Sequence, residues 1–443
     1  MAISRIDLNR YVPVVEKIKS IRFQGKVTQV VGLVIEGYCP DAAVGTLCEI
    51  HPQGGEPIPA EVVGFRDNKT LLMPLGELRG VGLGSLISVH RQMASLGVGP
   101  AMLGRVIDGL GAPIDGLGPI AVEEEYPIYA APVNPLTRVP ISKPLNLGIR
   151  AINGLLTCGE GQRVGIMAGS GVGKSTLLGM IARYTEADIN VIALIGERGR
   201  ELREFIEKDL QEEGLKKTVV VVATSDQPPL VRMRGAYIAT TIAEYFQAQG
   251  KKVLMMMDSA TRFAMAMREV GLAIGEPPTT KGYTPSVFAA LPKLLERTGN
   301  FPNGSITGLY TVLVEGDDFN EPISDAMRSI LDGHIVLSRD LAARSIYPPI
   351  DVLASASRVM MSVTERPHQQ LAGNFKELLA THRQAEDLIN IGAYKAGSNP
   401  KIDTAIAKMG AMNAFIKQEI HEEVGMEAAI AGLQGIFGAV ATV

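Results

Sequence analysis

The sequence lacks several features, and each absence narrows what the chain can be. Its 443 residues contain no tryptophan and only three cysteines. Cys39, Cys48 and Cys158 show no CxxC spacing, so neither a disulfide framework nor a zinc knuckle is predicted, and a reducing cytoplasm fits best. No run of about 18 uncharged apolar residues is present, so we expect no export signal and no membrane span. Any membrane association would therefore be peripheral.

Basic residues are not in excess. The chain has 43 Lys and Arg against 47 Asp and Glu, which gives a formal net charge of -4 and a pI near 6.0. Proteins that bind nucleic acid usually carry a basic surplus, although a local patch can hide in an acidic average. The composition disfavours nucleic acid as a partner and leaves the question to local features.

The length of the chain suggests two to four domains. Its pattern of apolar, polar and turn-forming residues changes twice along the sequence. Residues 1–95 hold short β-rich pieces separated by Gly, Pro and Asn, which indicate a small antiparallel barrel or sandwich. Residues 96–365 start with a proline-rich connector and continue as apolar runs alternating with helical patterns, which predicts a parallel sheet buried on both faces. Residues 366–443 have helical spacing throughout, so the expected fold class is α/β with an N-terminal β-barrel domain and a C-terminal helical domain.

One helical face in the last region is marked by regular spacing. Four apolar residues fall at i, i+4, i+7 and i+8: Leu371, Phe375, Leu378 and Leu379.

The stretch "RVGIMAGSGVGKSTLLGMIARY", residues 163–184, predicts a strand, a glycine-rich loop and a helix. Such a turn directs several backbone N–H groups and the positive end of a helix toward one point, which makes an anion site. We expect Lys174 to reach the β- and γ-phosphates of a nucleotide and the Ser175 hydroxyl to ligate Mg²⁺. The first position of GxxxxGK[ST] is Ala168, which suits a residue still in the strand. The alternative is a glycine-rich turn with a chance GKS.

Two carboxylates are candidates for the rest of the site. In "KVLMMMDS" the apolar run ends at Asp258. At the carboxyl edge of a buried strand, this carboxylate would hold Mg²⁺ through water; the alternative is that it caps a helix. The run "NVIALIGERGRE" places Glu197 just beyond another strand, where open α/β sheets keep their ligands. A carboxylate there would orient and polarise the water that attacks the γ-phosphorus. The charged residues that follow also fit the solvated start of a helix.

Several longer stretches carry a specific resemblance. They are "CGEGQRVGIMAGSGVGKSTLLGMIAR", "ALIGERGREL", "TKGYTPSVFAALPKLLERTG", "VLVEGDDFNEPISDAMRSILDGHIVLSRDLA" and "YPPIDVLASASRVM". From about residue 25 onward the chain resembles the flagellar export ATPases, the type III secretion relatives of the rotary ATP synthase catalytic subunit. The resemblance implies a central P-loop (RecA-like) ATPase domain.

The resemblance also implies roles for individual residues. Glu197 would be the catalytic carboxylate of the GER motif, and Arg262 in "DSATRF" would complete the site beside Asp258. Tyr347 in "SIYPPID" matches the aromatic that stacks on adenine, the alternative being a core tyrosine. Arg358 in "SASRVM" matches an arginine finger donated by a neighbouring subunit, the alternative being a surface or salt-bridged arginine. The phosphates would be cradled by Gly169, Ser170, Gly171, Val172, Gly173, Lys174, Ser175 and Thr176.

The function implied by the resemblance is hydrolysis of ATP with Mg²⁺ to energise flagellar protein export through the type III secretion apparatus. The chain would form a homohexamer with active sites between subunits. Implied partners are a stator-like regulator that meets the short N-terminal end, central-stalk proteins, and export substrates with their chaperones. The expected location is the cytoplasm, peripheral at the inner face of the cytoplasmic membrane through the export gate.

Three alternatives remain. The first is the ATPase of a virulence-type type III secretion system. The second is an RNA-translocating hexamer of the same fold, which would need aromatic and basic positions on the barrel, where Phe23, Tyr38 and Phe65 occur without a basic aromatic cluster. The third is a nucleotide-gated structural ring without turnover.

Overall fold

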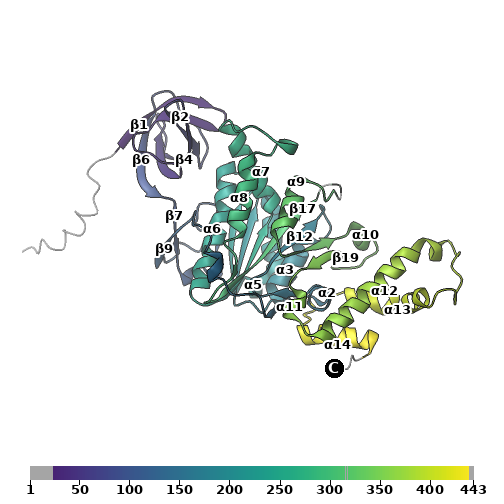
Figure 1. Cartoon of the computed structure of the whole chain (residues 1–443). Helices are drawn as coiled ribbons and strands as arrows, with labels where there is room; N and C mark the ends of the chain where they lie inside the picture. Colours follow the sequence, from purple (N-terminus) through teal and green to yellow (C-terminus); the bar gives the residue numbers. More distant parts are fainter. Residues whose placement is uncertain (1–22, 315, 317, 439–443) are drawn as a thin grey trace, which may run out of the picture. The chain divides into compact units, whose positions relative to one another are not determined.

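The computed structural model describes residues 23–314, 316 and 318–438 (Figure 1). The N-terminal end that was predicted to meet a stator-like partner lies outside these residues. The chain forms two compact units: one contains the N-terminal barrel up to Ser95 and also Ala273–Gly275, and the other contains Leu96–Leu272 and Glu276–Val443. Each unit is described by itself below. The division into three domains at residues 1–95, 96–365 and 366–443 remains a prediction from the sequence.

The first unit is a closed barrel of six antiparallel strands in the order β1-β2-β5-β4-β3-β6, with β6 pairing back to β1. Alternate residues of the strands face inward, so Ile35, Ile50 and Ile87 are fully buried in its interior. The predicted barrel is confirmed. Its strands are β1 (Phe23–Val31), β2 (Val34–Tyr38), β3 (Thr46–His51), β4 (Ile58–Arg66), β5 (Lys69–Pro74) and β6 (Leu86–Met93).

The second unit is built on a nine-stranded sheet whose main path has the order β19-β18-β12-β17-β15-β13-β14-β8. All pairs from β18 to β8 are parallel, as predicted, whereas β19 runs antiparallel to β18, and β16 runs antiparallel to β17. The strands are β8 (Val106–Asp108), β12 (Arg163–Ala168), β13 (Ile189–Ile195), β14 (Thr218–Ala223), β15 (Lys252–Asp258), β16 (Gly299–Asn300), β17 (Ser305–Leu313), β18 (Gly333–Leu337) and β19 (Ile350–Ser357).

Both faces of this sheet are covered, which explains why its strands are apolar throughout. Every residue of β13 and β14 is buried. Ile192 and Leu194 share a cluster with Leu177 of α3, and α6 packs against β13, β14 and β15 (Figure 1). The helices are α2 (Arg150–Leu155), α3 (Lys174–Tyr184), α4 (Gly199–Glu204), the π-helix η4 (Phe205–Leu210), α5 (Gln211–Lys216), α6 (Pro229–Ala248), α7 (Ala260–Ala273), α8 (Pro285–Leu295), α9 (Pro322–Ile330), α10 (Arg339–Ala343) and α11 (Met360–Val363).

The connector of the second unit contributes short elements before the sheet. They are β7 (Ser95–Val98), which pairs with β9 (Glu124–Pro127), β10 (Pro144–Leu145), which pairs with β11 (Cys158–Gly159), and the 3₁₀ turns η2 (Pro100–Met102) and η3 (Pro135–Thr137). A further 3₁₀ turn, η5 (Thr280–Gly282), precedes α8.

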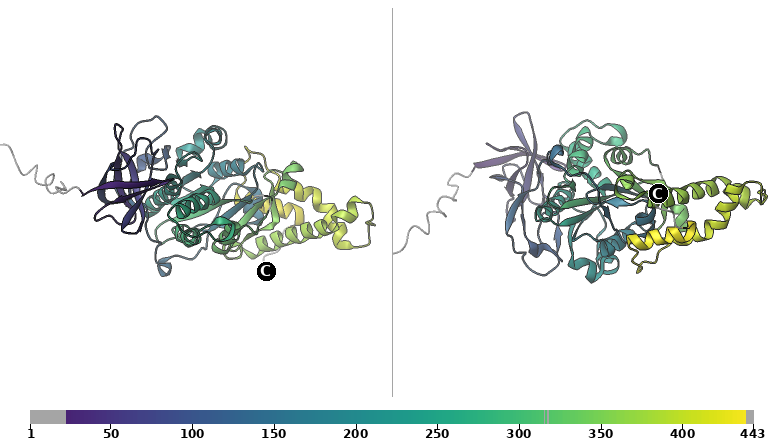
Figure 2. Two further views of the ribbon diagram at one scale, coloured as in Figure 1. Left: turned by 90° about the horizontal axis from the view of Figure 1, so that it is seen from above. Right: turned by 60° about the horizontal axis from the view of Figure 1, so that its bottom comes forward.

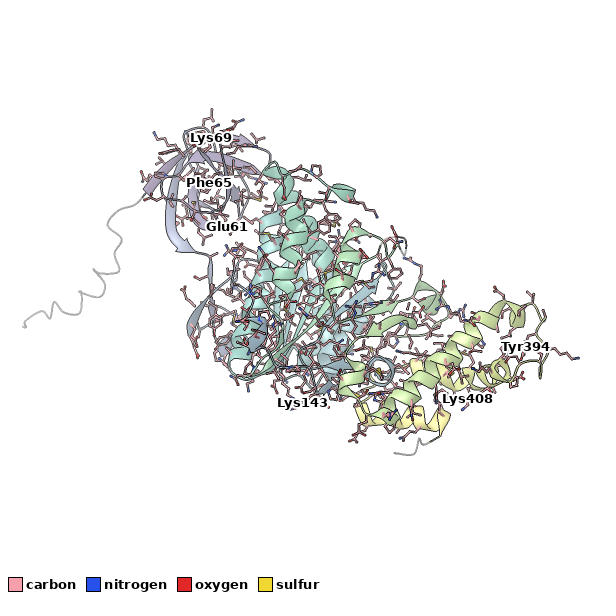
Figure 3. All side chains as sticks on the ribbon, viewed as in Figure 1. Glu61, Phe65, Lys69, Lys143, Tyr394 and Lys408 are labelled. Carbon is pink, nitrogen blue, oxygen red and sulfur yellow. The ribbon has the colours of Figure 1, made fainter. Side chains whose placement is uncertain are left out.

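The C-terminal part is helical, as predicted, and consists of α12 (Arg366–Asn390), α13 (Pro400–Ile416) and α14 (Met426–Phe437). Helices α12 and α13 run side by side (Figure 2). Leu371 and Phe375 are fully buried, and Phe375 lies 5.6 Å from Phe415 between ring centroids. Tyr394 lies in the loop that joins the two helices (Figure 3). Among the described residues, no helix combines the length and the apolar content needed to cross a lipid bilayer.

Candidate active site

The glycine-rich loop lies where the sequence predicted it. Strand β12 ends at Ala168, whose carbonyl accepts a hydrogen bond from the N–H of Val314 at 3.0 Å, so Ala168 is still a strand residue. Helix α3 begins at Lys174, and Gly173 before it has φ +91°, a conformation that favours glycine. No side chain caps this helix end. The first N–H groups of α3 are therefore available to an anion.

Lys174 lies between two carboxylates at the carboxyl edge of the sheet. Its Nζ donates a hydrogen bond to Oδ1 of Asp258 and lies 3.5 Å from Oε1 of Glu197. The side chains of Lys174, Asp258 and Glu197 are 13%, 5% and 19% exposed. Burial by itself lowers the pKa of Lys174, but the two carboxylates outweigh it and hold that pKa above its ordinary value. The group stays charged, as a phosphate ligand must.

Asp258 is not a helix cap, which was the alternative from sequence. The hydroxyl of Ser259, the next residue, accepts the N–H of Arg262 at 3.2 Å in the first turn of α7. Asp258 instead accepts a second hydrogen bond from the hydroxyl of Thr311 at 2.7 Å. The carboxylate is thereby fixed at the end of β15 and faces Lys174.

Glu197 is a carboxyl group with an unusual pKa. It follows β13 after Gly196, and its backbone carbonyl accepts the N–H of Ser225 at 3.0 Å. Burial and the nearby charge of Asp258 raise the pKa of Glu197 to about 7. Its low exposure does not fit the solvated helix start considered from sequence. A carboxyl group that titrates near neutral pH is suited to act as a general base.

A small pocket brings these groups together. It is lined by Ser175, Leu194, Glu197, Glu201, Leu202, Phe205 and Asp258. The predicted candidates Ser175, Glu197 and Asp258 thus share one space. Apolar side chains form the other walls and keep the carboxylates from full solvation.

Arg262 lies against the turn that carries Glu197. A Cβ atom built on Gly196 would approach Cβ of Arg262 to 2.8 Å, so any larger residue at 196 would displace the arginine. Nη1 of Arg262 lies 3.9 Å from Sδ of Met265, and its Nε is buried without a hydrogen-bond partner among the described residues. The arginine is next to the site, and within the described part of the chain it forms no ion pair with Glu197 or Asp258.

Tyr347 lies beside the phosphate loop. A Cβ atom built on Gly173 would lie 3.9 Å from the tyrosine ring, and half of Tyr347 is exposed. Its carbonyl accepts the N–H of Gln418 at 2.9 Å, which fixes the backbone at this position. An exposed ring does not fit the core tyrosine considered from sequence. The ring is free to stack on a flat ligand.

Arg358 is the one predicted site residue that the structure places elsewhere. It follows β19, whose Ser357 pairs with Gly333 at the start of β18, whereas the phosphate loop follows Ala168, which pairs with Leu337 at the end of β18. This register places Arg358 at the edge of the sheet opposite its own phosphate loop, and the residue is exposed there.

Sequence reasoning missed Thr311 and Glu201. Thr311 is a polar residue inside an apolar strand, but nothing in its neighbours indicates that it meets Asp258. Glu201 follows Glu197 by four residues, the spacing that aligns side chains on a helix, and this spacing is the only signal that pairs it with the site.

The fold and the site define a P-loop ATPase: a phosphate loop, a charged lysine and two buried carboxylates at the carboxyl edge of a parallel sheet. Residues 148–357 match the model of the ATP synthase alpha/beta family, nucleotide-binding domain, and residues 364–435 match the T3SS EscN ATPase C-terminal domain.

Relatives extend the match to almost the whole chain. The flagellum-specific ATP synthase of Bacillus subtilis (strain 168) is 53% identical over 432 residues, covering 96% of this chain and 97% of its own. The type 3 secretion system ATPase of Sinorhizobium fredii is 49% identical, covering 90% and 89%. The structure of the assembled ATPase EscN from the enteropathogenic E. coli type III secretion system is 47% identical with a TM-score of 0.87, covering 93% and 99%.

The chain therefore belongs to the ATP synthase alpha/beta family, in the branch of flagellum-specific ATP synthases and type III secretion ATPases. It is an ATP hydrolase. The resemblance, the fold class and the enzyme class predicted from the sequence are confirmed.

Proposed function

We propose that this chain hydrolyses Mg·ATP to energise export of flagellar proteins through a type III secretion apparatus, as a homohexamer with active sites between subunits. One observation carries the proposal. Lys174, Glu197 and Asp258 gather at one edge of the sheet, while the exposed Arg358 lies at the other, so a single chain holds both halves of a site without being able to join them.

The proposed chemistry assigns each group a task. The loop from Gly169 to Thr176 holds the phosphates, and the Tyr347 ring stacks on the adenine. Lys174 neutralises charge on the β- and γ-phosphates. Glu197 accepts a proton from the water that attacks the γ-phosphorus, and Arg262 steadies the turn that carries Glu197. Arg358 of the neighbouring subunit balances the charge that develops on the γ-phosphate.

Mg²⁺ fits the donors that are present. Ser175 and Asp258 supply oxygen atoms to the same pocket, and Mg²⁺ in nucleotide sites takes one or two protein oxygens and completes its shell with phosphates and water. When bound, the ion neutralises charge on the phosphate oxygens. We propose Ser175 as a direct ligand and Asp258 as a ligand through water.

The proposed partners follow from relatives. EscN has been solved assembled and in complex with its central stalk EscO, and that structure matches this chain with a TM-score of 0.87. By analogy, we propose a central stalk, a stator-like regulator, and export substrates with chaperones as partners. The proposed location is the cytoplasm, at the inner face of the membrane beside the export gate.

A secretion experiment tests the flagellar assignment against the virulence-type alternative. Deleting the chain in the bacterium that encodes it should remove flagellin and hook protein from the culture medium and abolish motility. Restoring the chain should restore both, and restoring Lys174→Ala should not. Normal flagellar secretion together with loss of secreted effector proteins would instead assign the chain to an injectisome.

The RNA-translocating alternative has one supporting observation. Tyr38 and Phe65 are exposed on the barrel and line one pocket with Arg66 (Figure 3 labels Phe65). However, Arg66 and Lys69 both pair with Glu36, at 2.6 Å and 2.8 Å, so the local charge is largely cancelled. A salt-dependent RNA-binding assay decides, because a translocase binds single strands tightly and loses affinity steeply with salt.

A further inference from the structure

The edge of the sheet opposite the phosphate loop carries two arginines and a histidine. Arg358 follows β19, His334 lies on the neighbouring strand β18, and Arg328 lies near the end of α9. Nη2 of Arg358 donates a hydrogen bond to the carbonyl of Arg328 at 3.1 Å. Burial, together with the charges of Arg328 and Arg358, lowers the pKa of His334. The hydrogen bond places the guanidinium of Arg358 against the backbone of Arg328.

The carboxylate of Asp332, whose backbone contacts Arg358, is engaged elsewhere. The carbonyl of Asp332 accepts the N–H of Arg358 at 3.0 Å, but its carboxylate accepts hydrogen bonds from Arg163, with Nε at 3.0 Å. Arg163 also pairs with Glu296, so one arginine removes two carboxylates from this edge. The guanidinium of Arg358 has no ion pair among the described residues.

The charge of Arg328 is only weakly cancelled. Its one acidic partner in the described part of the chain is Asp325, at 3.2 Å and with a side chain that is 74% exposed, and exposed pairs of this kind are screened by water. Nε of Arg328 is buried without a hydrogen-bond partner among the described residues. Nη2 of Arg328 also donates to the carbonyl of Phe319 at 3.0 Å, which anchors the side chain to the loop before α9.

We propose that Arg328 is a positioning residue for the arginine finger. Its carbonyl holds one nitrogen of Arg358, and its side chain, tied to the carbonyl of Phe319 and to Asp325, fixes the part of α9 that carries this carbonyl. Arg358 is thereby held in one orientation at this exposed edge, where the γ-phosphate of an adjacent subunit would meet it. This inference rests on the proposed function, because it requires the finger to act on a neighbour.

Substitutions at Arg328 test the role of its side chain. Arg328→Gln removes the charge and leaves the backbone carbonyl in place, so kcat should fall roughly tenfold, well short of the 10³- to 10⁵-fold attributed to a lost finger, with KM for ATP nearly unchanged. Arg328→Lys keeps the charge and should recover much of the rate. The control is Arg344→Gln, which breaks a comparable surface ion pair with Glu386 and should leave kcat unchanged.

Mixing of variants before assembly separates this role from a general structural one. Arg328→Gln mixed with Lys174→Ala should regain single-turnover rate, because some interfaces pair an intact phosphate loop with an intact finger edge. Arg328→Gln mixed with Arg358→Ala should not regain it, because every finger edge is then defective.

Recovery with Arg358→Ala but not with Lys174→Ala would place Arg328 at the nucleotide of its own subunit and overturn the inference. Full activity of Arg328→Gln would also overturn it. Should Arg328→Gln fail to assemble, Arg328→Met also removes the charge, retains more of the apolar side-chain length and provides the same comparison. A mixture of Lys174→Ala and Arg358→Ala that co-assembles but stays inactive would refute the shared site itself, and the inference with it. If the mixture of Lys174→Ala and Arg358→Ala recovers activity but the mixture of Arg328→Gln and Lys174→Ala does not, the proposed function stands and the positioning role of Arg328 is refuted.

Discussion

Tyr347 and Arg358 lie beyond opposite ends of one strand. Strand β19 pairs Ile350 with Leu337 at the phosphate-loop edge and Ser357 with Gly333 at the other edge. Its eight residues span roughly 25 Å at the usual rise of a strand, which is several times the reach of an arginine side chain. One strand thus joins the proposed base-binding end of a subunit to the finger that we propose the same subunit offers to a neighbour.

Tyr347→Ala should weaken ATP binding more than it slows the reaction. Stacking of a base on an aromatic ring contributes about 1–3 kcal/mol, so KM should rise by roughly tenfold with kcat nearly unchanged. Tyr347→Phe keeps the ring and should behave like the unmodified enzyme. Steady-state kinetics with ATP measures both, and an equal effect of the two substitutions would argue against stacking.

Lys174→Ala should abolish turnover and weaken nucleotide binding. The substitution removes the cation that meets the phosphates and leaves the carboxylates of Glu197 and Asp258 facing them, so kcat should fall by at least about 10²-fold. Titration with a fluorescent ATP analogue and a phosphate-release assay measure the two effects. Lys208→Ala, at an exposed lysine paired weakly with Glu204 at 3.9 Å, is the matched control and should change neither. An unaltered rate in Lys174→Ala would contradict the phosphate-loop assignment.

Glu197→Gln should separate binding from chemistry. The amide cannot accept the proton of the attacking water, so hydrolysis should fall by roughly 10²- to 10⁴-fold while Mg·ATP still binds. Glu204→Gln removes an exposed carboxylate from α4, the helix that follows Glu197, and should retain full rate. Parallel loss of binding and turnover in Glu197→Gln would indicate a structural role instead.

The pH dependence of kcat/KM should reveal the same group. The pKa of Glu197 is raised from its ordinary 4.5 to about 7, and only the ionised form accepts a proton. The rate should therefore be half-maximal near pH 7, level off about one unit above it, and approach a tenfold fall per unit at lower pH. The value of kcat/KM reports on the free enzyme, and Mg·ATP enters as one substrate. The fall of kcat/KM at low pH therefore refers to the nucleotide-free site. Persistence of the same fall in the residual activity of Glu197→Gln would assign it to another group.

Local patterns predicted most of the second unit. The strand and the helix predicted from "RVGIMAGSGVGKSTLLGMIARY" coincide with β12 and α3, because a continuous apolar run and the GKS turn are signals within one segment. The direction of β19 was not predictable, since an apolar pattern reads the same in a parallel and an antiparallel strand. That direction is what puts Arg358 at the far edge.

Contacts between distant segments explain the rest of what was missed. Thr311 contacts Asp258 only because β15 and β17 are neighbours in the sheet, although a long segment of the chain separates them in sequence. The pairing of Arg163 with Asp332, which engages the carboxylate of a residue whose backbone contacts Arg358, is likewise a tertiary contact. Side-chain chemistry indicated the candidate residues, whereas the sheet topology determined which of them share a site.

Single-turnover hydrolysis in mixed rings shows whether each active site is shared between two subunits. Lys174→Ala and Arg358→Ala should each be inactive alone. When the two are mixed before assembly, some interfaces combine the intact phosphate loop of one variant with the intact finger of the other. Hydrolysis of one bound ATP should then reappear in proportion to those interfaces, and a co-assembled mixture that remains inactive would show that Arg358 does not act across the subunit boundary.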